Sequence, residues 1–344
     1  MPRTSRRRRQ KIQRQLLLAA GAAGVLGVGV YLGGRGSDRV GPPAELPGGK
    51  LAVEEPATAP ATGPAAQPAA ADPGPAPRAR TAAAGLGGGV DPALLAEADR
   101  LIDAGDLLAA RKLLAQRLQA NDLDTAAAGP IKRRMQRVAE VVTFSPRPFA
   151  ADPHQGTFTV PAGGRLAKLA RPFDVPWQAI ARINGVNPRT IRAGQSLKTP
   201  VGPFHAVVDK GAFTLDLYLG DPLSPDGVFL KTYDVGLGEE ASTPTGLWKL
   251  RPGGKLEDPT WTNPRTGEVV AGDDPENPLG ERWIALDGVE GNAIGQQSYG
   301  IHGTIEPDTI GTNASMGCVR MLPDDVAEVY DYLEPGKSTV RVVE

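Results

Sequence analysis

Residues 299–304 read Tyr-Gly-Ile-His-Gly-Thr, and residues 315–320 read Ser-Met-Gly-Cys-Val-Arg. These two stretches hold Cys318, the only cysteine of the chain, and His302, one of three histidines. A cysteine attacks a carbonyl as its thiolate, and a free pKa of about 8.5 leaves the thiol mostly idle at neutral pH. An imidazole that takes the thiol proton activates the sulfur. The pattern therefore makes Cys318 a candidate nucleophile and His302 its candidate base.

The neighbours of the pair suggest how the site is held. A base is usually oriented by an acceptor on its other ring nitrogen, and no acidic residue lies beside His302. We therefore expect the backbone carbonyl of Gly303 to hold the ring. Gly317 allows a tight turn that could aim its own amide and that of Cys318 at a developing oxyanion. If the segment is extended, Arg320 lies on the same side of it as Cys318, where a guanidinium could hold a substrate carboxylate.

Three other interpretations are open at this point. A free cysteine is often an inert buried thiol. Arg320 could form an ordinary surface salt bridge. Zinc is a further possibility, but one cysteine and three scattered histidines offer none of the usual ligand spacings. We predict no metal and no cofactor. Residue chemistry alone leaves a catalytic and a structural Cys318 equally open.

Two further motifs extend the pattern: Thr-Pro-Thr-Gly at 243–246 and Asn-Pro-Leu-Gly-Glu-Arg-Trp-Ile at 277–284. With them, residues 204–343 resemble the L,D-transpeptidase (YkuD-like) catalytic domain of bacterial cell-wall enzymes. The resemblance implies that Cys318 is the acylated nucleophile, that His302 donates and accepts the proton, and that Gly303 orients His302. Many members carry a second histidine where this chain has Met316. The residues expected in the oxyanion or substrate-binding site are Gly317, Ser315, Arg320, Tyr299 and Thr304.

The resemblance also implies a reaction. Cys318 would attack the carbonyl of the third, diamino-acid residue of a peptidoglycan tetrapeptide stem and expel the terminal D-alanine. The thioester would then pass to an amine, which crosslinks or modifies peptidoglycan. Water as the acceptor would make the protein an L,D-carboxypeptidase, and a third alternative is a catalytically inactive peptidoglycan-binding protein.

Length and composition bound the other possibilities. The chain of 344 residues is long enough for two or three modest domains. A net charge of -1 argues against a nucleic-acid partner, which favours a strongly basic domain. The 43 glycines and 33 prolines indicate that much of the chain is linker and turn.

The N-terminal region has the pattern of a membrane-anchored exported protein. Residues 1–15 hold seven Lys or Arg and no acid, and residues 16–32 carry no charge. We expect 1–15 to be cytoplasmic and 16–34 to be a transmembrane anchor, or alternatively a cleaved signal peptide. The rest would then lie in the periplasm or cell-wall space. Residues 35–90 are rich in Pro, Ala and Gly and predict a disordered linker.

Two modules are predicted ahead of the catalytic region. Asp91-Pro92 is a good helix start, and periodic apolar residues on both sides of Gly105 predict a helical hairpin within 91–145. Residues 155–201 predict strand, helix, helix, strand (βααβ). With Ile-Asn-Gly at 183–185 and Ile-Arg-Ala-Gly-Gln-Ser-Leu at 191–197, they resemble a LysM module. That family binds N-acetylglucosamine chains, which implies a glycan partner in peptidoglycan.

The catalytic region, 203–344, is predicted to be mostly β, as a sandwich or barrel. Strands are expected at 206–208, 214–219, 228–235, 246–250 and 339–343, and a helix is expected after residues 323–325. Residues 252–278 show no clear strand signal and predict a long loop, which we interpret as a flap over the cleft. Trp261 in this loop is a candidate substrate contact or a packed aromatic, whereas Trp283 is expected to pack beneath His302.

Overall fold

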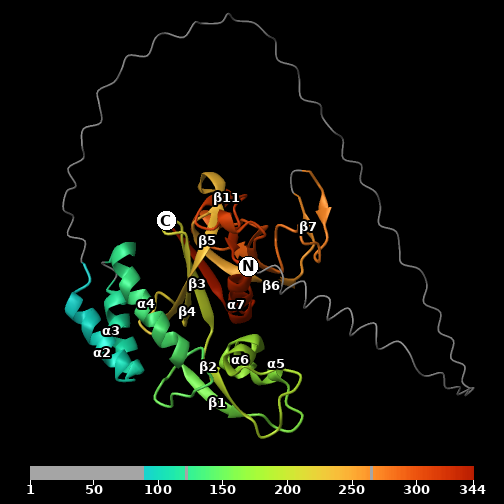
Figure 1. The fold of residues 1–344 in the computed structure, drawn as a ribbon. Helices are drawn as coiled ribbons and strands as arrows, with labels where there is room; N and C mark the ends of the chain where they lie inside the picture. Colours follow the sequence, from blue (N-terminus) through green and yellow to red (C-terminus); the bar gives the residue numbers. More distant parts are fainter. Residues whose placement is uncertain (1–88, 121–122, 264–265) are drawn as a thin grey trace, which may run out of the picture. The chain divides into compact units, whose positions relative to one another are not determined.

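The computed structural model describes residues 89–120, 123–263 and 266–344 (Figure 1). The predicted basic segment, membrane span and nearly all of the predicted linker lie outside these ranges. Within the described ranges, no helix is both long enough and apolar enough to cross a membrane.

Three helices occupy the segment for which a helical hairpin was predicted: α2 (Pro92–Asp103), α3 (Leu107–Gln119) and α4 (Thr125–Val142). Asp91 caps the first helix through a 2.8 Å bond from the Ala93 amide to its carboxylate. Asp124 caps α4 in the same way, at 2.7 Å from the Ala127 amide. Because this cap lies upstream of Gly129-Pro130, α4 begins before the proline and contains it.

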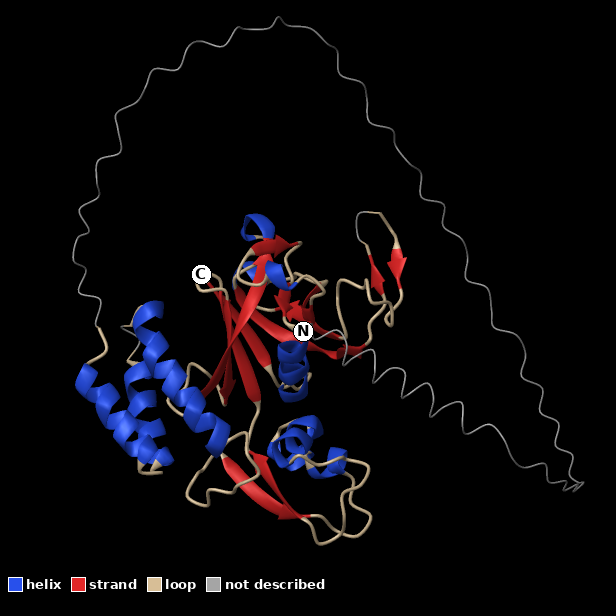
Figure 2. Ribbon diagram, in the orientation of Figure 1, coloured by secondary structure: helices blue, strands red, loops and turns tan. Residues whose placement is uncertain are grey.

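The next module has the predicted βααβ order, which confirms that part of the sequence analysis (Figure 2). It consists of β1 (Gln155–Thr159), α5 (Leu166–Leu169), the 3₁₀ turn η1 (Arg171–Phe173), α6 (Trp177–Asn184) and β2 (Ser196–Pro200). The two strands pair antiparallel. The amide of Asn184 links the helix end to the sheet, because it contacts both Ile180 O and Lys198 O.

The C-terminal region is a closed, mostly-β domain, as predicted. Its sheet has the order β11-β5-β12-β10-β9-β6-β13-β3-β4, and an added β4–β5 pairing closes the ring. The strands are β3 (Phe204–Asp209), β4 (Thr214–Leu219), β5 (Val228–Gly238), β6 (Gly246–Glu257), β9 (Arg282–Gly288), β10 (Tyr299–Gly303), β11 (Asn313–Ser315), β12 (Val319–Met321) and β13 (Thr339–Val343). The helical elements are α7 (Pro323–Tyr332) and the 3₁₀ turns η2 (Glu239–Ala241), η3 (Gly291–Ala293) and η4 (Pro307–Thr309).

The core of this domain follows from alternation along the strands. Along β3 buried residues alternate with half-buried ones, as expected when one face of a strand packs against the interior. Phe204, Leu215, Leu217 and Trp248 are among the large side chains that are almost fully buried. This packed interior gives the strands that carry the candidate site a rigid support.

The prediction of one long loop over 252–278 was wrong in part. Strand β6 continues to Glu257, and β7 (Trp261–Thr262) pairs with β8 (Val269–Val270) in a small hairpin (Figure 1). Pairing with β9 resumes at Lys255 after a bulge, which absorbs the Pro-Gly-Gly at 252–254. Tertiary pairing therefore overrides a weak local strand signal. Buried Asn277 ties the hairpin base together through Pro259 O at 2.7 Å and Ala271 O at 3.0 Å.

Candidate active site

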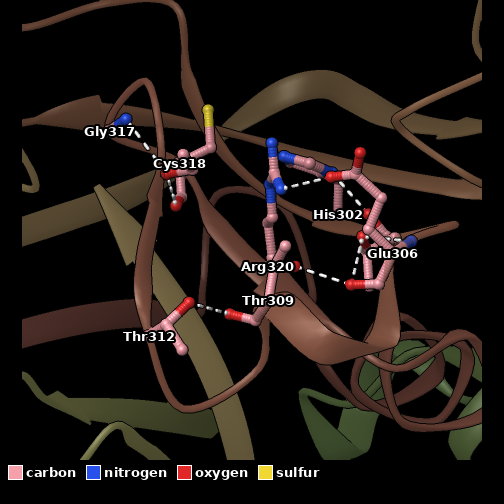
Figure 3. Close-up of polar contacts among 10 residues, drawn as sticks. His302, Glu306, Thr309, Thr312, Gly317, Cys318 and Arg320 are labelled. Carbon is pink, nitrogen blue, oxygen red and sulfur yellow. Dashed lines mark hydrogen bonds and ion pairs between the residues drawn. The ribbon is translucent and has the colours of Figure 1, made fainter. Parts of the chain in front are cut away.

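Two adjacent parallel strands bring the predicted pair together. Strand β10 carries His302, and β12 begins directly after Cys318. His302 is the register partner of Arg320, so the two side chains share one face of the sheet. Cys318 lies two residues before Arg320 and therefore shares this face. Figure 3 shows the side chains of Cys318, Arg320 and His302 in one cluster.

The imidazole of His302 is buried and held at one nitrogen. Its Nδ1 lies 2.6 Å from the carbonyl oxygen of Gly303, which is the contact expected from the sequence. The ring of Trp283 stacks on it with a centroid distance of 5.7 Å, which confirms the predicted packing. Because a carbonyl accepts only, Nδ1 carries the proton of the neutral ring, and Nε2 is left as the acceptor.

The electrostatics keep His302 neutral at pH 7. Burial lowers the pKa of His302 to about 4, and the positive charge of Arg320 acts in the same direction, against the opposing effect of the Gly303 carbonyl. The uncharged ring can therefore act as a base over the whole physiological range.

The thiol of Cys318 is half-buried and lies 4.0 Å from Ser298 O. Burial raises the pKa of the Cys318 thiol, although the Gly300 amide and the charge of Arg320 oppose this rise. Both shifts disfavour a standing thiolate–imidazolium pair. The resting site therefore holds a neutral thiol beside a neutral imidazole.

A tight turn presents Cys318. Gly317 has φ +122°, and a Cβ at this position would lie 2.6 Å from the Tyr299 ring, so only glycine fits. The Gly317 carbonyl accepts a 2.9 Å bond from the Thr243 hydroxyl, which itself accepts from the Gly238 amide at 2.9 Å. These bonds fix the backbone immediately before Cys318.

Several predicted site residues hold this turn and the loop that follows His302. Ser315 is buried, donates to Cys318 O at 2.7 Å and accepts from the Gly317 amide at 3.1 Å. The predicted use of the Gly317 amide as an oxyanion donor is therefore corrected, which leaves the Cys318 amide as the expected donor.

Buried Thr304 accepts from the Glu306 amide at 3.0 Å. The ring of Tyr299 packs on Trp248, with centroids 5.1 Å apart.

Arg320 carries the positive charge of the site. Its Nη1 contacts Glu306 Oε2 at 3.0 Å, and its Nε is buried without a hydrogen-bond partner. Glu306 could not be found from the sequence, because no motif includes it. The role of Thr243 could not be found either, although Thr243 belongs to a quoted motif, because the bond to Gly317 spans 74 positions of the chain.

Comparisons with known proteins match two regions of the chain to known families. Residues 203–342 match the L,D-transpeptidase catalytic domain family (YkuD), and residues 159–200 match the LysM domain family. The chain carries an L,D-transpeptidase catalytic domain preceded by a LysM domain.

Similar proteins include two named as L,D-transpeptidases. YkuD of Bacillus subtilis is 29% identical over 187 residues, which cover 52% of this chain and 94% of YkuD. YcfS of Escherichia coli is 30% identical over 197 residues, covering 51% of this chain and 57% of YcfS. A solved L,D-transpeptidase from Mycobacterium smegmatis aligns with 20% identity and a TM-score of 0.30, over 44% of this chain and 64% of that one.

The LysM domain provides a second candidate site. An open groove of about 540 Å³ follows the loop between α6 and β2. Its lining includes Gly185, Asn187, Thr190, Ile191, Arg192 and Gln195. In the L,D-transpeptidase domain and elsewhere in the described ranges, no group of three or more His, Cys, Asp or Glu side chains could hold a metal ion.

Proposed function

We propose that this chain is a cell-wall L,D-transpeptidase with Cys318 as its nucleophile. The observation that carries the proposal is a half-buried thiol directly before β12 and a neutral imidazole held at Nδ1 on the neighbouring strand β10, both in the matched domain. Such a nucleophile–base–acceptor arrangement is the usual requirement for acyl transfer through a covalent intermediate.

In the first step, Cys318 Sγ attacks the carbonyl carbon of the diamino-acid residue in a tetrapeptide stem. Nε2 of His302 takes the thiol proton as the bond forms, because neither group is charged at rest. The tetrahedral oxyanion would accept from the Cys318 amide. When this intermediate collapses, the carbon–nitrogen bond breaks, His302 gives its proton to the departing amine, and D-alanine leaves a thioester behind.

In the second step, the amine of a second stem attacks the thioester carbonyl. His302 takes a proton from that amine, the carbon–sulfur bond breaks, and the sulfur recovers the proton from His302. The products are a new amide crosslink and the free enzyme. Water in place of the amine would give a tripeptide and make the reaction an L,D-carboxypeptidation.

We also propose how the protein is positioned at the cell wall and the membrane. The groove of the LysM domain would hold the glycan while the catalytic domain acts on the stem peptides. The basic residues 1–15 and the uncharged stretch at 16–32 support a single-pass anchor in the cytoplasmic membrane, with the catalytic domain outside it.

The test compares full-length protein with its Cys318→Ala variant, both in detergent and supplied with tetrapeptide stems. We expect wild-type protein to release D-alanine and form dimers, and the variant to lose activity by a factor on the order of 10⁴ or more. Mass spectrometry of the products separates dimer from tripeptide, and a melting curve checks that the variant folds. Release of D-alanine that persists in a folded Cys318→Ala variant would exclude the mechanism.

A further inference from the structure

Arg320 and Glu306 form an ion pair whose two members differ in exposure. The Arg320 side chain is 17% exposed and the Glu306 side chain 62%. Of the five donors of a guanidinium, Glu306 uses Nη1, and Nε is buried without a partner. The cation is therefore mostly buried, whereas its carboxylate partner is exposed to solvent.

The backbone of Glu306 is held independently of its carboxylate. Its amide donates to Thr304 Oγ1 at 3.0 Å. Its carbonyl accepts from Thr309 Oγ1 at 2.7 Å, and Figure 3 shows Thr309 beside Glu306. Rotation of the side chain alone can therefore release Arg320, with no movement of the loop. An exposed pair of this kind is weak and changes an equilibrium by a factor of about five at most.

We propose that Glu306 is an internal competitor of the substrate carboxylate for Arg320, and that it thereby sets the apparent affinity for the donor peptide. This inference rests on the proposed function, since a tetrapeptide donor ending in D-alanine carries a free carboxylate near the scissile bond. A substrate carboxylate can accept from two guanidinium nitrogens, whereas Glu306 makes one bond. The Glu306 carboxylate is bonded to Arg320, so it would determine specificity by occupying that guanidinium and would take no part in bond making.

The experiment uses full-length Glu306→Gln and two synthetic donors. One is a tetrapeptide with free carboxylates, and the other is the same peptide with each carboxylate converted to an amide. For the free donor, we expect KM to fall about three- to fivefold in Glu306→Gln, with kcat changed less than twofold. For the amidated donor, KM should not change. A KM for the free donor that stays constant, or an equal fall for both donors, would overturn the proposal.

Two further variants make the test specific. Glu290→Gln removes another exposed acid of the same domain, which lies 3.6 Å from Arg341 and is 58% exposed. It should leave both KM values unchanged. In an Arg320→Gln background, Glu306→Gln should have no effect on KM, because the guanidinium for which Glu306 and the substrate compete is absent. If Arg320→Gln does not fold, the comparison of the two donors still tests whether Glu306 competes with the substrate carboxylate.

The outcomes separate this inference from the function beneath it. If wild-type protein cleaves neither donor in a Cys318-dependent way, the proposed function fails. If it cleaves the free donor but Glu306→Gln has the same KM as wild type, only the competitor role fails.

Discussion

The candidate active site has a held side and an open side. On the held side, His302 is bound at Nδ1 and the Gly317 turn is fixed by hydroxyl and amide bonds. On the open side, Glu306, Met316 and Ile305 are exposed by 62%, 52% and 43%. The groups assigned to bond making are held by backbone contacts, whereas Glu306, Met316 and Ile305 are exposed to solvent.

This difference has a physical reason. A reacting group must keep its position to within a few tenths of an ångström, and a misplacement of about 1 Å can cost a factor on the order of 10² in rate. Groups that receive a flexible peptide gain from remaining adjustable, because side-chain rotation lets them exchange partners. Substitutions on the held side should therefore have larger effects than substitutions on the open side.

After Cys318→Ala, the largest of these effects is expected for His302→Gln. Loss of the base should reduce the rate of D-alanine release by a factor on the order of 10² to 10⁴. Steady-state release by full-length protein measures this, and the thermal unfolding midpoint reports whether the fold persists. A folded variant with nearly wild-type rates would place the base elsewhere.

The same residue makes acid stability testable. Its pKa is about 4 in the folded protein, below the ordinary 6.5, so the unfolded chain binds more protons between these values. Stability due to His302 is therefore present above pH 6.5 and is lost as the pH falls through that window. From pH 7 to pH 5 the loss is about 2 kcal/mol. Urea unfolding at both pH values should show this loss in wild type and a smaller one in His302→Gln; equal losses would contradict the assignment.

The next largest effect is expected for Gly317→Ala. A methyl group at φ +122° would meet Tyr299 at 2.6 Å and displace the nucleophile turn, which should lower the rate by about 10². The matched control is Gly336→Ala, where φ is +81° but nothing lies within 4 Å. This control should lose about 1 kcal/mol of stability and no activity. Equal activity losses in the two variants would mean that backbone strain alone, and not the fit at Tyr299, is responsible.

A smaller effect is expected for Thr243→Val. This variant leaves the Gly238 amide and the Gly317 carbonyl without their buried partner, at a cost of about 1–3 kcal/mol of stability. The turn should loosen enough to lower the rate by about tenfold, a modest fraction of the loss for a fully misplaced group. Thr243→Ser keeps the hydroxyl and should remain close to wild type in rate and in urea unfolding. If serine fails to rescue, Thr243 contributes packing and not hydrogen bonds.

The Glu306→Gln variant described above belongs to the open side and has the smallest expected effect. We expect it to change KM without changing kcat, whereas we expect the substitutions on the held side to lower the rate. A large fall in kcat for Glu306→Gln would remove the distinction between the two sides.

Much of the fold and of the reactive pair could be predicted from local sequence. The βααβ order of the LysM domain follows from periodicity and from Asn184-Gly185 at a helix end. The mostly-β character of the catalytic domain follows from short alternating strands. The extension of β6 could not be predicted, because its Pro-Gly-Gly segment is strand only through pairing with β9 across a bulge.

The amino-acid sequence by itself determined which residues could react, because a single cysteine and a histidine in motifs with Gly303, Gly317 and Arg320 limit the chemistry. Only the tertiary structure decided which polar groups are already engaged. Ser315 and the Gly317 amide bind each other, Thr243 reaches Gly317 from 74 positions away, and Glu306 meets Arg320 across the site. The physical reason is that a motif fixes residue types along the chain, whereas hydrogen-bond partners depend on which strands and loops the closed sheet brings together.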